Sequence, residues 1–273
     1  MLLSDLHLHT TKSDGVFEPS RLFEYVRSRE LGAFSVTDHD CMDAYPVPQD
    51  LRERCIPGLE IDCELNGHTV HLLAYGIEDP ECTLLRRLVS QREKRQARMQ
   101  AMLEQLQPFG IDVTMDEVLR EAKNASSIGR PHLARVLVSK RHVASVQEAF
   151  DRYLADEQTC FVPLPRLACT EIMDLAHEAG GVLVAAHPMR LRDIADLQTL
   201  CEAGLDGVEV IHPTACASDE MMLMEFARAR GLLTTGGTDF HAPAGKEIGV
   251  ELPAEALEEL REAIAARKAV GVD

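Results

Sequence analysis

Histidines and carboxylates recur at short spacings along the sequence, and these residue types bind divalent metals. In the segment Asp5-Leu6-His7-Leu8-His9, the two histidines are two residues apart, so they lie on one face of an extended chain. The same pattern includes Asp14, His39, Glu60, His71, His187, Asp239 and His241. So many ionisable groups would be expensive to desolvate together unless cations compensated them. The pattern predicts a metal site, although a single histidine beside an apolar run is more often an ordinary core residue.

Short apolar runs of strand length separate these residues, and most of the runs end in a polar cluster. They cover 2–6, 33–36, 55–61, 69–75, 181–186, 207–211 and 232–235. Helical patterns lie between them, at about 19–31, 170–179, 194–203, 218–230 and 253–269. Strands that alternate with helices predict a parallel α/β architecture, here a barrel one unit short of a TIM barrel. Its active site is expected at the carboxyl ends of the strands, with Glu60 at the end of the third strand.

The block 81–165 breaks the alternation and is rich in helical signals. One helical pattern covers 83–107, and capping-box patterns begin further helices after Thr114 and Ser145. In the preceding block, Asn66-Gly67 predicts a hairpin turn. We expect residues 1–80 and 166–273 to form the barrel, and 81–165 to form a helical insertion domain that contributes to substrate binding.

The ligand set contains imidazoles and carboxylates, which suits manganese, zinc or iron. The eight cysteines include no Cys-x-x-Cys pair, so neither a zinc ribbon nor a redox motif is expected. Asp5, Asp38 and Asp40 are candidates to orient the histidines from outside the ligand set, with turn capping or solvation as the alternative. His212 also ends an apolar run, where it could face the substrate or support a ligand.

Four motifs together resemble the signature motifs of the PHP (polymerase and histidinol phosphatase) phosphoesterases. They are Asp5-Leu6-His7-Leu8-His9, Thr37-Asp38-His39, Ala186-His187-Pro188 and Thr238-Asp239-Phe240-His241. The resemblance runs over essentially the whole chain. It implies the PHP fold, which is a distorted (β/α)7 TIM-like barrel, and up to three divalent metal ions, with manganese ahead of zinc or iron.

The resemblance also implies which residues hold each ion, and these ligands are the expected catalytic residues. The first ion is expected on His7, His9, Glu60 and Asp239. Glu60 would bridge to a second ion, which is completed by His71 and His187. The third ion is expected on Asp14, His39 and His241. Some members of the family have a histidine in place of Asp14.

Basic residues of the insertion are candidates for substrate recognition. Arg87, Gln91, Lys94 or Arg95, and Arg98 recur at helical spacing and share one face, which is either solvated or turned toward the substrate. Arg130 and His132 lie at an expected helix start, where backbone N–H groups favour an anion. The planar guanidinium of arginine also fits phosphate through two hydrogen bonds.

These features resemble the branch of the family that removes the 3′-phosphate from nucleoside 3′,5′-bisphosphates, converting pAp to AMP. Close relatives in that branch trim short 5′-phosphorylated RNA from its 5′ end. The expected activity is therefore that of a phosphoric monoester hydrolase, a 3′,5′-nucleoside bisphosphate phosphatase. The substrate-binding residues implied by this resemblance are Asp14, His39, Arg95, Arg98, Arg130, His132 and His241.

Three alternatives stay open from the sequence. One is a 5′-3′ exoribonuclease acting on short RNA, and another is a histidinol-phosphate phosphatase. The latter has no second phosphate to recognise, so Arg130 and His132 speak against it. The third is a binding module without catalysis, which the presence of all nine expected ligands disfavours.

The amino-acid composition excludes some classes of binding partner and substrate. With 28 Lys+Arg against 45 Asp+Glu, the net charge is −17, which argues against binding duplex nucleic acid through phosphate neutralisation. Only 4% of the residues are aromatic and none is Trp, so no platform for stacking a long single strand is expected. A mononucleotide or very short oligonucleotide fits better. No apolar run reaches membrane-span length and no leader pattern precedes the first strand, so a cytoplasmic enzyme without a membrane partner is expected.

Overall fold

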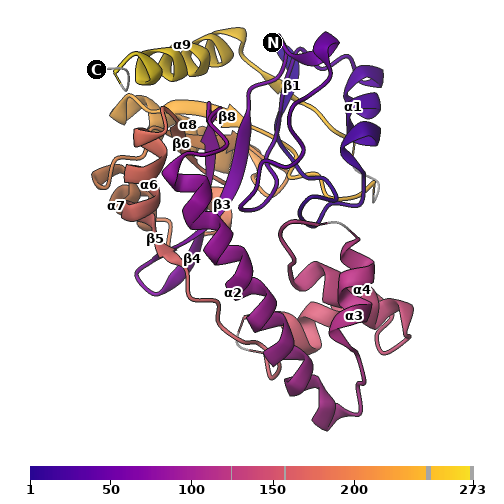
Figure 1. Cartoon of the computed structure of the whole chain (residues 1–273). Coiled ribbons are helices and arrows are strands. Elements are labelled where there is room, and N and C mark those ends of the chain that lie inside the picture. The colour runs from indigo at the N-terminus through magenta and orange to yellow at the C-terminus, as the bar shows by residue number, and fades with distance from the viewer. Residues whose placement is uncertain (124, 157, 244–246, 271–273) are drawn as a thin grey trace.

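The structure, a computed structural model, describes residues 1–123, 125–156, 158–243 and 247–270 (Figure 1). Its strands are β1 (Leu2–Leu8), β2 (Ala33–Val36), β3 (Gly58–Leu65), β4 (His68–Tyr75), β5 (Leu167–Ala168), β6 (Val182–Ala185), β7 (Gly207–Ile211), β8 (Leu233–Gly236) and β9 (Val250–Leu252). Its α-helices are α1 (Pro19–Ser28), α2 (Thr83–Leu106), α3 (Met115–Ala122), α4 (Arg130–Ser139), α5 (Val146–Ala149), α6 (Cys169–Glu178), α7 (Asp196–Glu202), α8 (Ala217–Arg230) and α9 (Ala254–Val270). Short 3₁₀ turns are η1 (Gln49–Leu51), η2 (Gln107–Phe109) and η4 (Pro188–Arg190), and η3 (Phe150–Leu154) is π-helical.

The strands form two hydrogen-bonded sheets, in the orders β2-β1-β9 and β5-β3-β4-β6-β7-β8. Pairing is parallel between β1 and β2 and along β6, β7 and β8, whereas β4 runs antiparallel to both of its neighbours. Isolated bridges join the two sheets into a barrel. Phe34–Cys55 and His39–Glu60 connect the β2 side to the β3 side, and Leu8–Phe240 connects β1 to the segment after β8. This is the predicted distorted (β/α)7 barrel, with one reversed strand.

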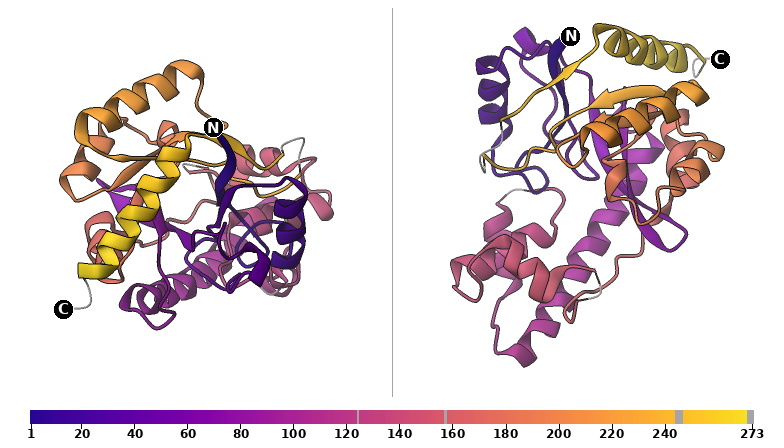
Figure 2. Two further views of the ribbon diagram at one scale, coloured as in Figure 1. Left: turned by 90° about the horizontal axis from the view of Figure 1, so that it is seen from above. Right: turned by 180° about the vertical axis from the view of Figure 1, so that it is seen from behind.

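Alternating side chains on the strands fill the barrel and cover its outside. On β4, Leu73 packs inside with Leu6 and Val184, whereas the adjacent Leu72 packs outward in the cluster that contains Ile172 of α6. The inner cluster continues to Leu260 of α9, which crosses one end of the barrel (Figure 2). Among the described residues, no helix is long and apolar enough to cross a membrane.

The hairpin of β3 and β4 is longer than the sequence pattern indicated. Asn66 and Gly67 form its turn with positive φ values of 53° and 78°, as the Asn-Gly pair predicted. Because the strands pair continuously from Gly58–Tyr75 to Leu65–His68, β3 continues past Glu60. The expectation that Glu60 ends the third strand is therefore wrong, and Glu60 is the third residue of β3.

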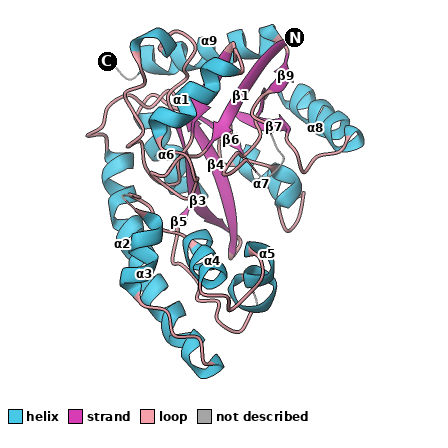
Figure 3. Cartoon of the chain, turned by 90° about the vertical axis from the view of Figure 1, so that its right-hand side faces the viewer, coloured by secondary structure: helices cyan, strands magenta, loops and turns pink. Residues whose placement is uncertain are grey.

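Between β4 and β5, the chain forms helices α2 to α5 with an apolar core of their own, which includes Met102, Val118 and Leu133. The start of α2 lies against the barrel, with Leu84 and Leu88 in the cluster that contains Ile172, whereas α3 to α5 lie beyond the end of the barrel opposite α9 (Figure 3). The capping box predicted at Thr114 is present, with Glu117 bonded back to the Thr114 N–H. At Ser145 only the hydroxyl half forms, because the Glu148 carboxylate accepts instead from the N–H of Ala144.

Candidate metal centre

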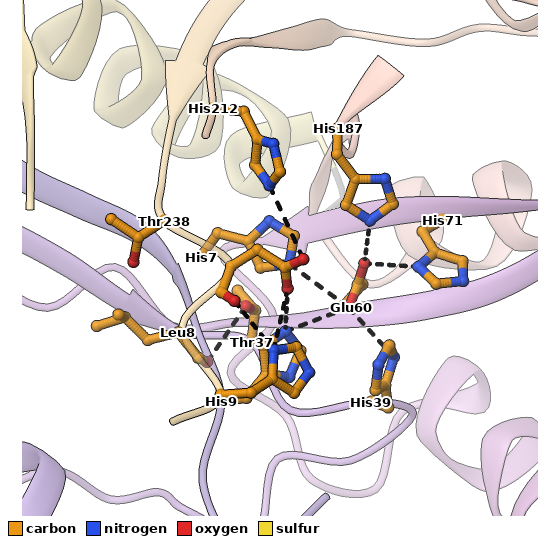
Figure 4. Close-up of polar contacts among 12 residues, drawn as sticks. His7, Leu8, His9, Thr37, His39, Glu60, His71, His187, His212 and Thr238 are labelled. Carbon is orange, nitrogen blue, oxygen red and sulfur yellow. Dashed lines mark hydrogen bonds and ion pairs between the residues drawn. The ribbon is translucent and has the colours of Figure 1, made fainter. Parts of the chain in front are cut away.

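Side chains from β1, β3 and β4 and from the loops after β1, β2, β6 and β8 meet at the end of the barrel that faces the insertion. Figure 4 shows how His7, His9, His39, His71 and His187 lie around Glu60. All nine expected ligands lie in groups whose ligand atoms are within 4.8 Å of one another. The groups are His7, His9, Glu60 and Asp239; Glu60, His71 and His187; His9, Asp14, His39 and His241; and His39, Asp62 and His71. The first three contain the sets implied by resemblance, with His9 added to the third, and the fourth includes a carboxylate that the sequence analysis did not single out.

Distances within the first group match those between ligands of one ion. The Nε2 atoms of His7 and His9 lie 3.3–3.5 Å from Glu60 Oε2 and from Asp239 Oδ1. Two tetrahedral ligands bound to one ion at about 2.0–2.2 Å are themselves separated by about 3.3–3.6 Å. The four atoms are therefore spaced as a metal ion requires.

Several of these atoms are buried and have no hydrogen-bond partner among the residues that the structure describes. They are His7 Nε2, His9 Nε2, Asp14 Oδ1 and Glu60 Oε2. Leaving so many buried polar atoms unpaired is costly. Because they converge on one region and comprise nitrogens and carboxylate oxygens, the residues present fit divalent cations.

Glu60 connects the first group to the second. Its Oε1 lies 2.8 Å from His71 Nδ1 and 3.0 Å from His187 Nε2, while Oε2 faces the first group. In the third group, His241 Nε2 is 3.0 Å from Asp14 Oδ1, and His39 Nε2 is 3.9 Å from Asp14 Oδ2. Glu60, with Oε2 toward the first group and Oε1 toward the second, has the geometry of a bridging ligand.

The protonation states reflect a concentration of opposite charges. Burial alone would lower the pKa of His39, but Glu60, Asp14 and Asp62 outweigh it and raise that pKa to about 10. The pKa of His241 is raised to about 9, since Asp14 and Asp239 overcome its burial in the same way. Burial would raise the pKa of Glu60, yet the surrounding histidines hold it well below its usual range. A divalent cation would replace the protons on these imidazoles.

Glu209 of β7 supports this cluster and was missed in the sequence. It is fully buried, and its two oxygens lie 3.0 Å from His7 Nδ1 and 2.6 Å from the His187 N–H. With Nδ1 of His7 held by a carboxylate, Nε2 is left facing Glu60 and Asp239. An acidic residue within the apolar run 207–211 was the available signal.

The three aspartates suggested as outer partners have different roles. Asp38 accepts from the Ser13 hydroxyl, which lies 3.4 Å from His9 Nδ1. Asp5 accepts from the backbone of His7 and from Thr238, so it orients the chain rather than an imidazole. Asp40 accepts from Arg95 of α2 and contacts no imidazole nitrogen among its hydrogen bonds.

A cavity of about 260 Å³ opens from the metal-ligand cluster toward the insertion. One wall carries Asp14, His39, Glu60, His71, His187, Asp239 and His241, and the other carries Arg95, Arg98, Arg130, Arg166 and Phe150. Arg166, Phe150 and the rim residue Arg190 were not singled out in the sequence, where no local periodicity connects them. Phe150 offers one aromatic ring to the cavity, which does not test the expectation that the chain lacks a platform for a long single strand.

Four arginine side chains lie close together on the insertion side of the cavity. Burial, together with Arg130, Arg166 and Arg95, lowers the pKa of Arg98 to about 9, and its Nη2 has no partner among the described residues. Arg130 bonds to the exposed Asp156 at 2.6 Å. A group of guanidinium ions this close together favours a bound anion.

Other residues expected to bind the substrate lie behind the cavity surface or are already paired. Arg95 lines the cavity but forms ion pairs with Asp40 at 2.7 Å and Asp62 at 2.9 Å, while Lys94 is exposed. His132 is not among the described residues that line the cavity, and its Nδ1 accepts from the N–H of Gly129. Arg87 lies outside the cavity and pairs with Glu171.

His212 and a second cavity complete the surroundings of the cluster. His212 is buried, with Nε2 3.8 Å from Asp239 Oδ2 and its ring against those of His7 and His187. It therefore supports the ligand cluster from the side. A larger cavity of about 900 Å³ lies between α2 and the loop after β2 and touches none of the nine expected ligands.

Several known proteins similar to this chain are named as enzymes that cleave phosphoesters. A 5′-3′ exoribonuclease, Rnm, from Salmonella typhimurium is 31% identical over 89% of this chain and 86% of its own length. A 3′,5′-nucleoside bisphosphate phosphatase from Chromobacterium violaceum is 31% identical over 90% of each chain. The crystal structure of a proposed metal-dependent phosphoesterase from Bifidobacterium adolescentis matches with a TM-score of 0.83 and 30% identity, over 99% of this chain and 96% of that one. No family model matches the sequence.

The fold and the site thus define a metal-dependent phosphoesterase, a hydrolytic enzyme. The chain belongs to the PHP phosphoesterases, in the branch that contains 3′,5′-nucleoside bisphosphate phosphatases and Rnm exoribonucleases.

Proposed function

We propose that this enzyme hydrolyses the 3′-phosphate of nucleoside 3′,5′-bisphosphates, using up to three divalent metal ions held by the nine ligands. The observation that carries the proposal is the cavity with two different walls, one suited to metal ions and one to an anion. A substrate with two phosphates would place one on each wall. Manganese is the proposed metal, with zinc or iron as alternatives, because the ligands are imidazoles and carboxylates.

Each wall has a separate task in this proposal. Bound divalent ions would supply charge that polarises the phosphate and acidifies a water molecule. Glu60 would fix the first two metal-ligand groups relative to each other, because each of its oxygens faces one of them. His39 and His241 line the cavity, so their rings would contact the phosphoryl group or the leaving oxygen. Arg98 and Arg130 would bind the second phosphate, which fixes the first in line for attack.

The size and lining of the cavity favour a small substrate. A cavity of about 260 Å³ leaves little room for a ligand larger than a single nucleotide. Phe150 lines the cavity, and the guanidinium of Arg130 lies 5.6 Å from its ring centre, so a base stacked on Phe150 would lie beside the arginines. The insertion would therefore recognise both the second phosphate and the base.

Initial rates with Mn-loaded protein test the proposal directly. The panel is adenosine 3′,5′-bisphosphate, 5′-AMP, a 5′-phosphorylated RNA trinucleotide and histidinol phosphate, with phosphate and nucleotide products both followed. We expect the bisphosphate to be hydrolysed fastest and to yield 5′-AMP. Faster release of mononucleotides from the RNA would instead favour the exoribonuclease activity named for a relative. A lead for histidinol phosphate would reject the role given to the arginines.

A pair of variants separates recognition of the second phosphate from catalysis. Arg130→Ala should lose activity on the bisphosphate while retaining activity on simple monoesters. Arg152→Ala is the matched control, because Arg152 also belongs to the insertion but is half exposed and pairs with Glu148 outside the cavity. Equal losses on both substrates in Arg130→Ala would contradict the proposal.

A further inference from the structure

Asp62 lies two residues after Glu60 on β3, so both side chains point from the same face of the strand into the site. The Asp62 side chain is 6% exposed, and its Oδ1 has no hydrogen-bond partner of good geometry among the described residues. That oxygen is 3.3 Å from His39 Nδ1 and 3.4 Å from His71 Nε2. One buried carboxylate oxygen thus faces two imidazoles, His39 from the loop after β2 and His71 from β4.

The second oxygen of Asp62 is held by the insertion. Arg95 of α2 approaches Oδ2 at 2.9 Å and is itself fixed by Asp40, whose Oδ2 lies 2.8 Å from its Nε. Gln91, one turn earlier on α2, donates to the Asp62 backbone carbonyl at 2.8 Å. The carboxylate is therefore held from α2 and cannot easily turn away from the two histidines.

The nitrogens that face Asp62 are opposite those that face the other carboxylates. His71 directs Nδ1 toward Glu60 at 2.8 Å, and its Nε2 remains for Asp62. His39 directs Nε2 toward Asp14 at 3.9 Å, and its Nδ1 lies between Glu60 and Asp62. A neutral imidazole that binds a metal through one nitrogen carries a proton on the other, and this N–H needs an acceptor.

We propose that Asp62 is a positioning residue that accepts the remaining ring N–H of both His39 and His71, and that Arg95 holds it in place. Asp62 thereby links helix α2 of the insertion to the second and third metal positions. The inference rests on the metal roles proposed above and adds a support that serves two ligands at once. It also gives Arg95 a different role from substrate binding, since the guanidinium acts on metal affinity through Asp62.

Metal titration by calorimetry tests this role without relying on activity. In Asp62→Asn we expect two of the three ions to bind about 10–100-fold more weakly, as is usual when an outer partner of a ligand is lost. The ion on His7, His9, Glu60 and Asp239 should keep its affinity. Glu64→Gln is the matched control, because this substitution removes the same charge from an exposed position of β3 and should change no metal affinity.

A second variant guards against a loss caused by misfolding. Arg95→Lys keeps the charge beside Asp62 but loses the planar fork, so it should weaken the same two ions to a smaller degree. Near-ultraviolet circular dichroism of both metal-free variants should match that of the wild type. A change in KM for the substrate with unchanged metal affinities in Arg95→Lys would overturn the role assigned to Arg95.

Anomalous diffraction from Mn-loaded crystals provides the decisive geometry. We expect Asp62 Oδ1 at hydrogen-bond distance from both rings and no manganese peak beside it. A peak bonded to Oδ1 would overturn the inference, because Asp62 would then be a ligand. Equal metal affinities in wild type and Asp62→Asn would also overturn it while leaving the proposed function intact. Wild-type protein that binds no metal would reject the proposed function as well.

Discussion

Two clusters of carboxylate and histidine lie at opposite ends of the barrel and differ in how their polar atoms are paired. Asp206, just before β7, accepts from His177 Nε2 and from the Leu183 N–H, both at 2.8 Å, and its other oxygen pairs with Arg267 of α9. At the mouth, Glu60 Oε2 and the imidazole nitrogens that face it have no such partners among the described residues. The same residue types therefore serve two purposes.

The difference shows how a structural polar cluster is distinguished from a binding site. A carboxylate whose hydrogen bonds are complete stabilises the fold and has no capacity left for a ligand. Buried polar atoms that converge without partners are costly until a ligand pairs with them. The Asp206 cluster is thus expected to affect stability, and the Glu60 cluster is expected to affect binding and catalysis.

The largest effect is expected from Glu60→Gln. The variant should lower kcat/KM by more than about 100-fold, because losing even an outer partner of a metal ligand costs about 10–100-fold. Manganese should raise the Tm of the variant by much less than that of the wild type, as scanning calorimetry would show, because only the third ion is held without Glu60. If Glu60→Gln kept both activity and metal-dependent stabilisation, the distinction between the two clusters would fail.

Arg98→Ala tests an unpaired atom on the insertion side of the mouth. A hydrogen bond to a charged group contributes about 1.5–3 kcal/mol, so kcat/KM for a nucleoside bisphosphate should fall by about 10–100-fold. Rates on a simple phosphate monoester should change little. A steady-state comparison of the two substrates decides the point, and a parallel fall on both would show that Arg98 acts on the metal side.

Asp206→Asn should have the reverse profile. Loss of the charge paired with Arg267 and His177 is expected to destabilise the fold by about 1–3 kcal/mol. Chemical denaturation measures this loss, and kcat/KM at a temperature where the variant is folded should match the wild type. Reduced metal affinity in Asp206→Asn would mean that the two ends of the barrel are coupled.

His132 should give the smallest effect, which depends on pH. Burial lowers its pKa to about 4, below the ordinary value of 6.5. The unfolded chain therefore binds the proton more readily, and stability is lost as pH falls from about 6.5 toward 4, at about 1 kcal/mol per pH unit. His132→Asn retains an acceptor for the Gly129 N–H and should remove this slope when both metal-free proteins are denatured at several pH values. An unchanged slope would show that His132 is protonated in the folded chain.

The alternation of strands and helices was predictable because it depends on local periodicity. The Asn66-Gly67 turn and the cap at Thr114 were predictable for the same reason, since each needs only a few neighbouring residues. The expectation that these side chains meet at one mouth came from the rule for strand ends in such barrels, although Glu60 and His71 lie within β3 and β4, and the division into three sets came from the resemblance to the PHP phosphoesterases.

Residues that depend on pairing between distant segments were missed. Asp62 becomes a neighbour of His71 only through the antiparallel register of β3 and β4. Glu209 lies within an apolar run, and only the position of β7 in the barrel brings its carboxylate to His7. Helical spacing also could not distinguish Arg95 from Lys94, because one residue of rotation decides which of them faces the barrel.

The way in which the chain enters and leaves the insertion affects how freely the insertion can change during evolution. The segment leaves after β4 and returns through β5, which pairs with β3, the hairpin partner of β4. Its two ends are thus held together by the barrel, and loop-closure entropy rises only slowly with the length of what lies between them. Helices α3 to α5, whose apolar core is separate, can be lengthened, lost or exchanged there at little thermodynamic cost to the strands, whereas α2 also buries Leu84 and Leu88 against the barrel. Under the inference drawn above, the contact of Arg95 with Asp62 would be a constraint on that freedom.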